Sequence, residues 1–222
     1  MSQAISPFFR IRTLLFLALV SAQLTSYCQW DQSPFDSQRL WMQAEAEWEH
    51  HQYGSAMNLY SRWIQSDNEN QPSLSALANF RLAACAIELQ HADAENGIQN
   101  FMESYPESPL VQEAQWMYAN FLYRKRDWND AIAAFESIRT TRMPVAQKRE
   151  LQFKKGHAQF ELERYEDARL DLFAVMENPE ESGKFAANAQ YYFSHISYIK
   201  GQPQVALSGF QSLASNPEFD QI

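Results

Sequence analysis

The sequence predicts an all-α protein, an α-α superhelix (solenoid) of about five similar helical hairpins. Three observations support this: an apolar pattern recurs every 37 to 38 residues, prolines fall between its copies, and glycine is scarce. Periods of 20 to 50 residues are typical of stacked repeats. The chain has 222 residues, 45% apolar and 14% aromatic, with 6 glycines and 9 prolines. This composition favours long helices with a packed core over a loop-rich β protein.

The repeat is anchored on the small residue of the segment RDWNDAIAAF. Aligning the chain on it gives an alanine in five places, namely Ala56, Ala94, Ala131, Ala168 and Ala206. Apolar side chains follow four and seven residues later, which places them with the alanine on one helical face. They are Tyr60, Ile98, Phe135, Leu172 and Phe210, then Trp63, Phe101, Ile138, Val175 and Leu213. We call the five alanines the anchor alanines.

Each unit is predicted to be a helix of about 14 residues, a turn, a second helix and a short connection that carries proline. A second small residue stands twelve positions before the anchor in four units, at Ala44, Ala119, Gly156 and Ser194. Two small residues allow the helices to approach toward the lower end of the ~8 to 10 Å packing range. The predicted units span residues 37–71, 73–108, 109–145, 147–182 and 183–217.

In the third unit the individual roles can be predicted. We expect Trp128 to support the turn, Ala131 to be the close contact between helices, and Phe135 with Ile138 to fill the seam with the next hairpin. The second and fifth units depart from the pattern. Leu82 stands where a small residue is expected, and Pro203 replaces the aromatic residue before Ala206.

The pattern resembles the tetratricopeptide repeat, in the variant whose second helix ends Tyr-Pro-x-Ser, here Tyr105-Pro106-Glu107-Ser108. The resemblance covers residues 37–217. It implies a right-handed superhelix whose first helices line a concave groove, and a scaffold that binds a protein or peptide segment without catalysis. For a bacterial source, the resemblance extends to periplasmic helper proteins of the cell envelope.

The N-terminal 28 residues read as a signal peptide. Arg10 and Arg12 precede the apolar run TLLFLALVSA, and cleavage is expected after Ala22 or Cys28. The run is shorter than the ~20 residues that a membrane-spanning helix needs, so we expect no transmembrane span in the mature chain. Bulky Tyr27 disfavours lipid attachment at Cys28. The chain is therefore expected to be exported, to the periplasm, the cell envelope or the medium, with residues 29–36 as a linker.

The predicted first helices carry pairs of residues spaced by seven: Trp41 and Trp48, Phe80 and Ile87, Trp116 and Tyr123, Phe153 and Phe160, Tyr191 and Tyr198. Two interpretations stay open. These side chains fill the core between successive first helices, or several form a part-exposed rail for a peptide or a glycan. Polar residues lie between them, at Glu45, Asn120, His157 and His195. The groove candidates are Trp41, Trp48, Trp116, Tyr123, Arg124, Phe153, His157, Phe160, Tyr191, His195 and Tyr198.

The charge of the chain disfavours nucleic acid as a partner, because the formal net charge is -9. Half of the 18 basic residues nevertheless lie in the window 124–155, which is +5 by itself. This window is either a solvated edge balanced by acids of neighbouring hairpins, or a docking patch for an acidic protein segment or an anionic envelope polymer.

The sequence carries no motif of a known catalytic or metal site, so no cofactor is expected and the chain is predicted not to be an enzyme. Cys85, in the apolar segment RLAACAIEL, is predicted to be a core residue rather than a reactive thiol. Two alternative functions remain: a glycan- or peptidoglycan-associated envelope module, and the recognition arm of a larger enzyme. The latter is open because no polar capping helix follows Ala214.

Overall fold

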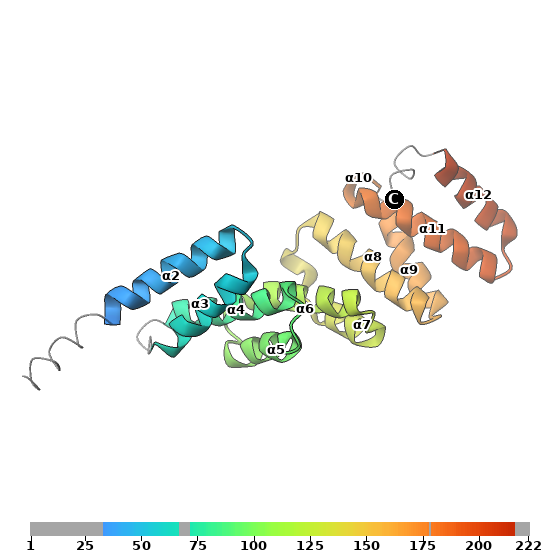
Figure 1. Cartoon of the computed structure of the whole chain (residues 1–222). Helices are drawn as coiled ribbons and strands as arrows, with labels where there is room; N and C mark the ends of the chain where they lie inside the picture. The colour runs from blue at the N-terminus through green and yellow to red at the C-terminus, as the bar shows by residue number, and fades with distance from the viewer. Residues whose placement is uncertain (1–32, 67–71, 178, 216–222) are drawn as a thin grey trace, which may run out of the picture. The chain divides into compact units, whose positions relative to one another are not determined.

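The computed structural model describes residues 33–66, 72–177 and 179–215. These residues form eleven α-helices and one short 3-10 helix, with no β-strand among them (Figure 1). The chain divides into two compact units, residues 1–91 and 92–222. The predicted all-α class with stacked helical hairpins is confirmed. The predicted signal peptide lies outside the described residues, and no described helix is long and apolar enough to cross a membrane.

Unit 1 contains α2 (Ser33–Glu49), α3 (Tyr53–Gln65) and α4 (Pro72–Glu88), with α3 packed against both neighbours. α2 begins four residues before the predicted first unit. The core of unit 1 consists of Ala44, Ala56, Tyr60, Trp63, Ala78 and Cys85. Cys85 is fully buried, and burial raises the pKa of its thiol to about 12. The thiol is therefore protonated at neutral pH, as expected of a core residue.

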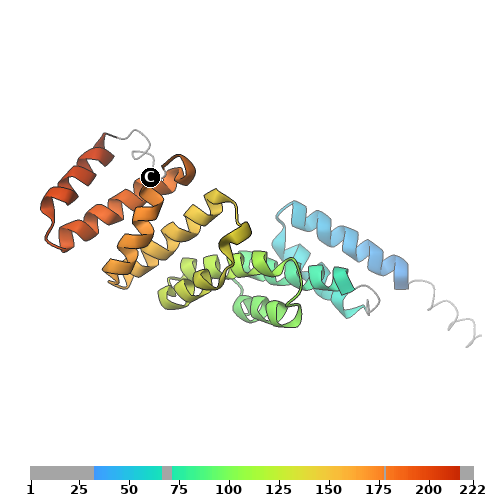
Figure 2. The same ribbon diagram turned by 180° about the vertical axis from the view of Figure 1, so that it is seen from behind.

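Unit 2 contains the remaining helices, in which each hairpin packs against the next (Figure 2). They are α5 (Ala94–Ser104), α6 (Val111–Lys125), α7 (Trp128–Ser137), the 3-10 helix η1 (Thr140–Arg142), α8 (Val145–Glu161), α9 (Tyr165–Met176), α10 (Pro179–Ser182), α11 (Lys184–Ile199) and α12 (Pro203–Ala214). The first helices of its hairpins are α6, α8 and α11, and the second helices are α7, α9 and α12. α11 packs against both α9 and α12.

All five first helices end in the same left-handed turn. The residues with positive φ are His51, Gln90, Arg126, Glu163 and Gly201. At each, the next residue donates its backbone N–H to a carbonyl five positions back, as Asp127 does to Leu122 and Arg164 to Gln159. This pair of features is the Schellman motif. Of the five turns, only the one at Gly201 could be predicted from the sequence, because glycine is the residue that usually adopts a positive φ.

The anchor alanines are buried, and those of α3, α7, α9 and α12 lie in helices that pack against the first helix of their own hairpin, as predicted. Four are completely buried and Ala206 is 2% exposed. Gly156 shows how tight the approach is, since a Cβ added there would lie 3.0 Å from Cγ of Leu172. In the second predicted repeat, whose first helix is α4, Leu82 is half-buried, while its neighbours Ala83 and Ala84 are buried. The buried small residue of this repeat is therefore Ala83, which stands eleven residues before Ala94, whereas the spacing in the other repeats is twelve.

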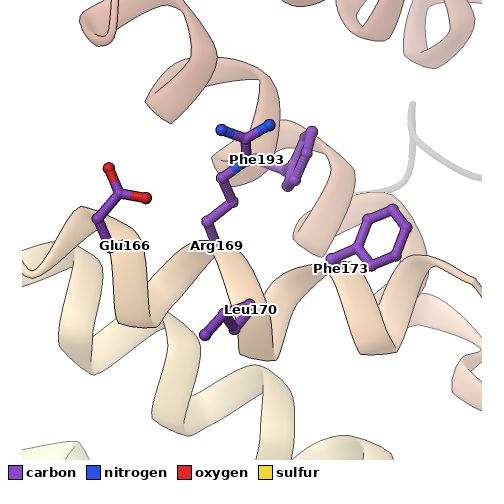
Figure 3. A pocket seen from close by; sticks show the side chains of 5 residues that line it. All are labelled: Glu166, Arg169, Leu170, Phe173 and Phe193. Atoms are coloured by element: carbon purple, nitrogen blue, oxygen red, sulfur yellow. The ribbon is translucent and has the colours of Figure 1, made fainter.

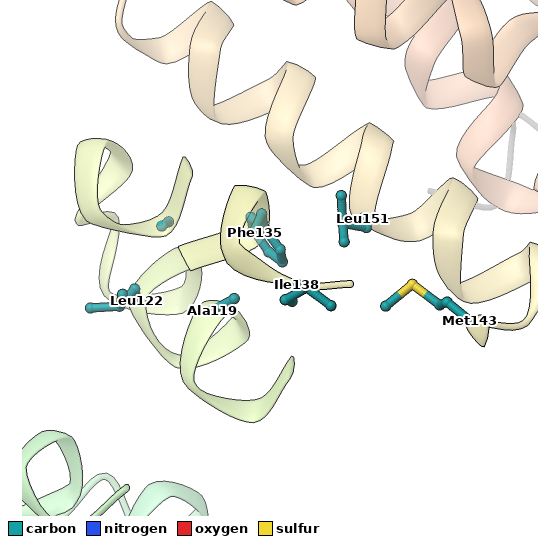
Figure 4. Packing of buried hydrophobic residues seen from close by; sticks show 7 residues of the cluster. Ala119, Leu122, Phe135, Ile138, Met143 and Leu151 are labelled. Atoms are coloured by element: carbon teal, nitrogen blue, oxygen red, sulfur yellow. The ribbon is translucent and has the colours of Figure 1, made fainter. Parts of the chain in front are cut away.

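The third hairpin confirms the roles predicted for its residues. Ala131, Phe135 and Ile138 are buried in one cluster that also contains Leu151 of α8 (Figure 4). The ring of Trp128 lies 5.4 Å from that of Tyr123 across the turn. Ile138 differs in one respect, because it follows the end of α7 in extended backbone. It still fills the seam with the next hairpin.

Candidate functional site

The first helices of unit 2 bring most of the predicted groove residues into one series of ring contacts. The Tyr123 ring of α6 lies 5.6 Å from the His157 ring of α8, which lies 4.7 Å from the Tyr192 ring of α11. Phe160 continues the series to His195, at 5.4 Å. We call the first-helix side chains on this side the aromatic row. The rings in mutual contact are Tyr123, Phe153, His157, Phe160, Tyr191, Tyr192 and His195; Trp116 of α6 and Tyr198 of α11 belong to the row by their sequence positions, without a ring contact to the other members among the described residues.

His157 occupies the middle of the row and is mostly buried. Its Nδ1 shares a hydrogen bond of 2.7 Å with the Tyr123 hydroxyl, and its Nε2 lies 3.5 Å from the Glu161 carboxylate. The rings of Trp128 and Phe153 also contact it. Burial lowers the pKa of His157, and Arg126 lowers it further against the opposing effect of Glu161. The imidazole is therefore a neutral packing element at pH 7.

The lowered pKa of His157 predicts a loss of stability in mild acid. Because the folded pKa is below the unfolded value of 6.5, the contribution is fully present above pH 6.5 and is lost as pH falls through the folded pKa. Between about pH 7.5 and about pH 5, wild type should lose more unfolding free energy than His157→Gln, which cannot take up the proton. Urea unfolding at each pH measures the difference.

The matched control is His50→Gln, since His50 is exposed at the end of α2. This variant should keep the wild-type pH dependence. If His157→Gln keeps it as well, His157 is solvated in its protonated form and the buried position is wrong.

Polar residues of the first helices are bound by the following first helix. In unit 2, the Lys154 ammonium donates to Asn120 Oδ1 and, at 2.5 Å, to Glu150. It lies 5.4 Å from the Trp116 ring. One repeat later, at the equivalent positions, the His157 and Tyr192 rings are in contact, since Tyr192 follows Lys154 by 38 residues. Asn120 and His157 therefore join successive hairpins.

Unit 1 also has a basic side chain of one first helix, Arg81 of α4, in contact with residues of the preceding first helix, α2. The Arg81 guanidinium lies 4.2 Å from the Trp48 ring and 3.8 Å from the Glu45 carboxylate. Glu45 also accepts a 2.5 Å hydrogen bond from the buried Tyr60 hydroxyl. Trp41 packs on Tyr60 and Trp63. These candidates thus belong to unit 1 and are not part of the aromatic row.

Burial separates the predicted groove residues into three groups. Phe153 is buried, as are Phe80 and Ile87 of the same pattern. Seven are half-buried, namely Trp41, Trp48, Trp116, Tyr123, His157, Phe160 and His195. Arg124, Tyr191 and Tyr198 are exposed, and the two tyrosines are 40% and 66% accessible. The row is most open on α11.

Several side chains of the basic window 124–155 are paired with acids. Lys125 contacts Glu95 and Asp127, and Arg149 contacts Glu181. Lys154 and Lys155 have acidic partners as well. These contacts agree with a balanced edge for those four residues, while Arg124 beside Tyr123 projects into solvent.

Sequence reasoning missed a cavity between α9 and α11. It has a volume of about 430 Å³ and is lined by Glu166, Arg169, Leu170, Phe173 and Phe193 (Figure 3). We call it the outer pocket, since none of its residues belongs to the aromatic row. Leu170 and Phe173 are 73% and 47% exposed. Their large apolar side chains, one turn apart on α9, are the sequence signal that could have indicated it.

No group of three or more His, Cys, Asp or Glu side chains that could hold a metal ion occurs within the ranges that the structure covers. Unit 1 has a shallow hollow on α2 lined by residues that include Asp36, Arg39 and Met42, and in the described part of unit 2 two candidate binding surfaces stand out, the aromatic row and the outer pocket. Both offer apolar contact area with a few polar groups, which suits binding rather than chemistry.

Residues 77–108, which span most of α4 and α5, match the family model of the tetratricopeptide repeat. The fold is similar to that of MamA in several solved structures. MamA MSR-1 is 11% identical with a TM-score of 0.62, covering 84% of this chain and 97% of that one. MamA from Desulfovibrio magneticus RS-1 is 10% identical (0.63; 83% and 95%), as is MamA AMB-1 (0.65; 85% and 98%). Among curated protein sequences, none matches. At these identities the likeness shows the fold.

Proposed function

We propose that this protein of tetratricopeptide-like hairpins is an exported, non-catalytic scaffold that binds a segment of a partner protein along the aromatic row of unit 2. The matched repeat and the MamA-like fold support a protein-binding role. The observation that carries the proposal is the row itself, in which three successive first helices present rings in mutual contact. Its end on α11, at Tyr191 and Tyr198, is open to solvent.

The geometry suits recognition because the row is already ordered without a ligand. His157 is held by contacts to two neighbouring first helices, α6 and α11, and Lys154 is held by contacts to α6. Side chains fixed in advance lose little conformational entropy when a ligand binds. Tyrosine rings supply apolar area while their hydroxyls can form hydrogen bonds. Exposed Arg124 at the other end of the row favours a segment that carries acidic residues.

Binding along the row can be tested with the double variant Tyr191→Ala/Tyr198→Ala. Full-length protein is used to capture partners from the native envelope fraction, with quantitative mass spectrometry as the readout. The double variant should lose its enriched partner by at least about tenfold, since aromatic anchors dominate protein interfaces. Val205→Ala, on α12 and 46% exposed, is the matched control and should keep the partner.

The proposal is wrong if the double variant captures the same partner as wild type at the same level. Sedimentation with insoluble polysaccharide tests the alternative of a glycan-binding module. Loss of sedimentation in the double variant, with no protein partner captured, would replace the protein-binding proposal by the glycan alternative.

Export rests on the N-terminal segment and is tested separately. Replacing two leucines of the apolar run, Leu15→Arg and Leu17→Arg, should leave the protein inside the cell, because the segment then lacks the apolar core that a signal peptide needs. Wild type should appear in the envelope or medium with a new N-terminus after Ala22 or Cys28. Fractionation and N-terminal sequencing give the answer, and uncleaved wild type in the cytoplasm would contradict export.

A further inference from the structure

The outer pocket occupies a position that is closed by polar bonds elsewhere in unit 2. Counted from the anchor alanines, Phe173 corresponds to Gln99 and Glu136, and Phe193 corresponds to Tyr118 and Lys155. At the α5 and α6 junction, Gln99 Nε2 donates to the Tyr118 hydroxyl at 2.7 Å. At the α7 and α8 junction, Lys155 lies 3.8 Å from Glu136.

At the α9 and α11 junction these polar pairs are replaced by two aromatic rings. Phe173 and Phe193 lie 6.0 Å apart, and Leu170 stands beside them where the earlier units have Asn96 and Ala133. Neither Leu170 nor Phe173 is covered, as their exposure shows. Large apolar side chains are left in solvent at one junction, while the equivalent residues of the other junctions are polar or small. This difference indicates a surface used for binding rather than for stacking the repeats.

Arg169 supplies a positive group at the same place. Its guanidinium lies over the Phe193 ring, 5.1 Å from the centroid (Figure 3). No ion pair of Arg169 occurs within residues 33–66, 72–177 and 179–215. The nearby Glu166 carboxylate accepts a hydrogen bond of 2.8 Å from Lys200, which lowers the pKa of Glu166. The charge of Arg169 also lowers the pKa of Glu166, but the hydrogen bond to this carboxylate comes from Lys200, so the N–H groups of Arg169 can donate to a carboxylate from outside.

We infer that the outer pocket binds a segment of a partner protein in which an aliphatic or aromatic side chain is adjacent to an aspartate or glutamate. The apolar side chain would pack against Leu170 and Phe173, and the carboxylate would accept hydrogen bonds from Arg169. Guanidinium groups bind carboxylates through two parallel hydrogen bonds. The volume of about 430 Å³ lies within the range of ~300 to 1,000 Å³ typical of ligand sites. The inference uses none of the residues of the aromatic row, so it goes beyond the proposed function.

The experiment selects peptides that need this pocket. A displayed heptapeptide library is panned on the immobilised full chain. Excess soluble Leu170→Ser/Phe173→Ser protein is present as a competitor, and it removes peptides that bind any surface other than the outer pocket. Surviving peptides should combine an acidic residue with an apolar neighbour. A labelled synthetic peptide of the consensus is then titrated by fluorescence anisotropy. Arg169→Gln should raise its Kd at least about tenfold, because a charged hydrogen-bond donor is lost.

Two controls make the result specific. Leu207→Ser, at the position of α12 equivalent to Arg169 and with 58% of Leu207 exposed, should leave the Kd unchanged. So should Tyr191→Ala/Tyr198→Ala, which keeps this test independent of the proposed function. Raising the salt concentration from about 50 to about 500 mM should weaken wild-type binding more than binding to Arg169→Gln.

The inference is overturned if no peptide survives the competition, or if the survivors lack carboxylates. An equal Kd for wild type and Arg169→Gln overturns it as well. Circular dichroism melting of each variant shows whether it is folded; since the substituted side chains are exposed or half-buried, the midpoints should stay close to wild type.

Discussion

Replacing Phe135 by alanine is expected to lower the free energy of unfolding of unit 2 by about 3 to 5 kcal/mol. Phe135 is 1% exposed and lies in the cluster that joins α6, α7 and α8. Its ring is 6.1 Å from Trp116 and 6.3 Å from Tyr123. Truncation removes apolar contacts on two sides and leaves a cavity, because the surrounding helices are held by their own partners and can relax only partly.

Chemical denaturation of the full chain measures this effect, and hydrogen exchange of the α6 and α7 amides shows where it acts. Exchange is informative because stacked repeats can open one at a time. Phe173→Ala is the matched control, since the same side chain is 47% exposed there. Its cost should be below about 1 kcal/mol. A comparable loss in both variants would mean that Phe135 is not in the core.

Replacing Ala131 by leucine is expected to destabilise unit 2 by about 1 to 3 kcal/mol. Ala131 is completely buried in the same cluster as Ala119, which is buried to the same degree. Three added carbon atoms have no space there, so α6 and α7 must move apart or the leucine must adopt a strained rotamer. The midpoint of urea unfolding should fall without a change in the slope.

Ala133→Leu controls for the chemical change. Ala133 is exposed on the same helix, and leucine there should change the unfolding free energy by no more than about 0.5 kcal/mol. An unchanged midpoint for Ala131→Leu would contradict its role as the contact point. Because Ala56, Ala168 and Ala206 hold the equivalent position in their hairpins, that result would also weaken the packing assigned to those three hairpins.

The contacts between successive first helices connect packing to binding. Asn120 and His157 lie at equivalent positions, and each meets a residue of the next first helix, Lys154 or Tyr192. Asn120 Oδ1 accepts from Lys154, and the two ring nitrogens of His157 contact Tyr123 and Glu161. Polar groups that the sequence suggested for ligand recognition therefore already have partners within the protein. The contacts between the helices also fix the spacing and orientation of the rings in the aromatic row. A partner would therefore meet a preformed surface, with the exposed tyrosines of α11 as its accessible part.

The sequence by itself determined the fold class, the hairpins and the residues at their closest contacts. It could do so because these properties are local and repeated: a 3.6-residue period defines a helical face, and five anchor alanines in register leave little ambiguity. The shift in the second unit was also visible from the spacing of Leu82 and Ala94. Burial of Ala131, Phe135 and Cys85 followed the apolar pattern directly.

Only the tertiary structure decided which side chains of the first helices remain available. Each is covered or left open by the next hairpin, 37 to 38 residues away, so its exposure depends on a residue that the local pattern does not contain. His157 is mostly covered because Tyr192 packs against it, whereas Tyr198 stays in solvent. The outer pocket arises in the same way, from Phe193 placed across from Phe173. Periodicity encodes the helical face, while the availability of a face is set by contacts between distant repeats.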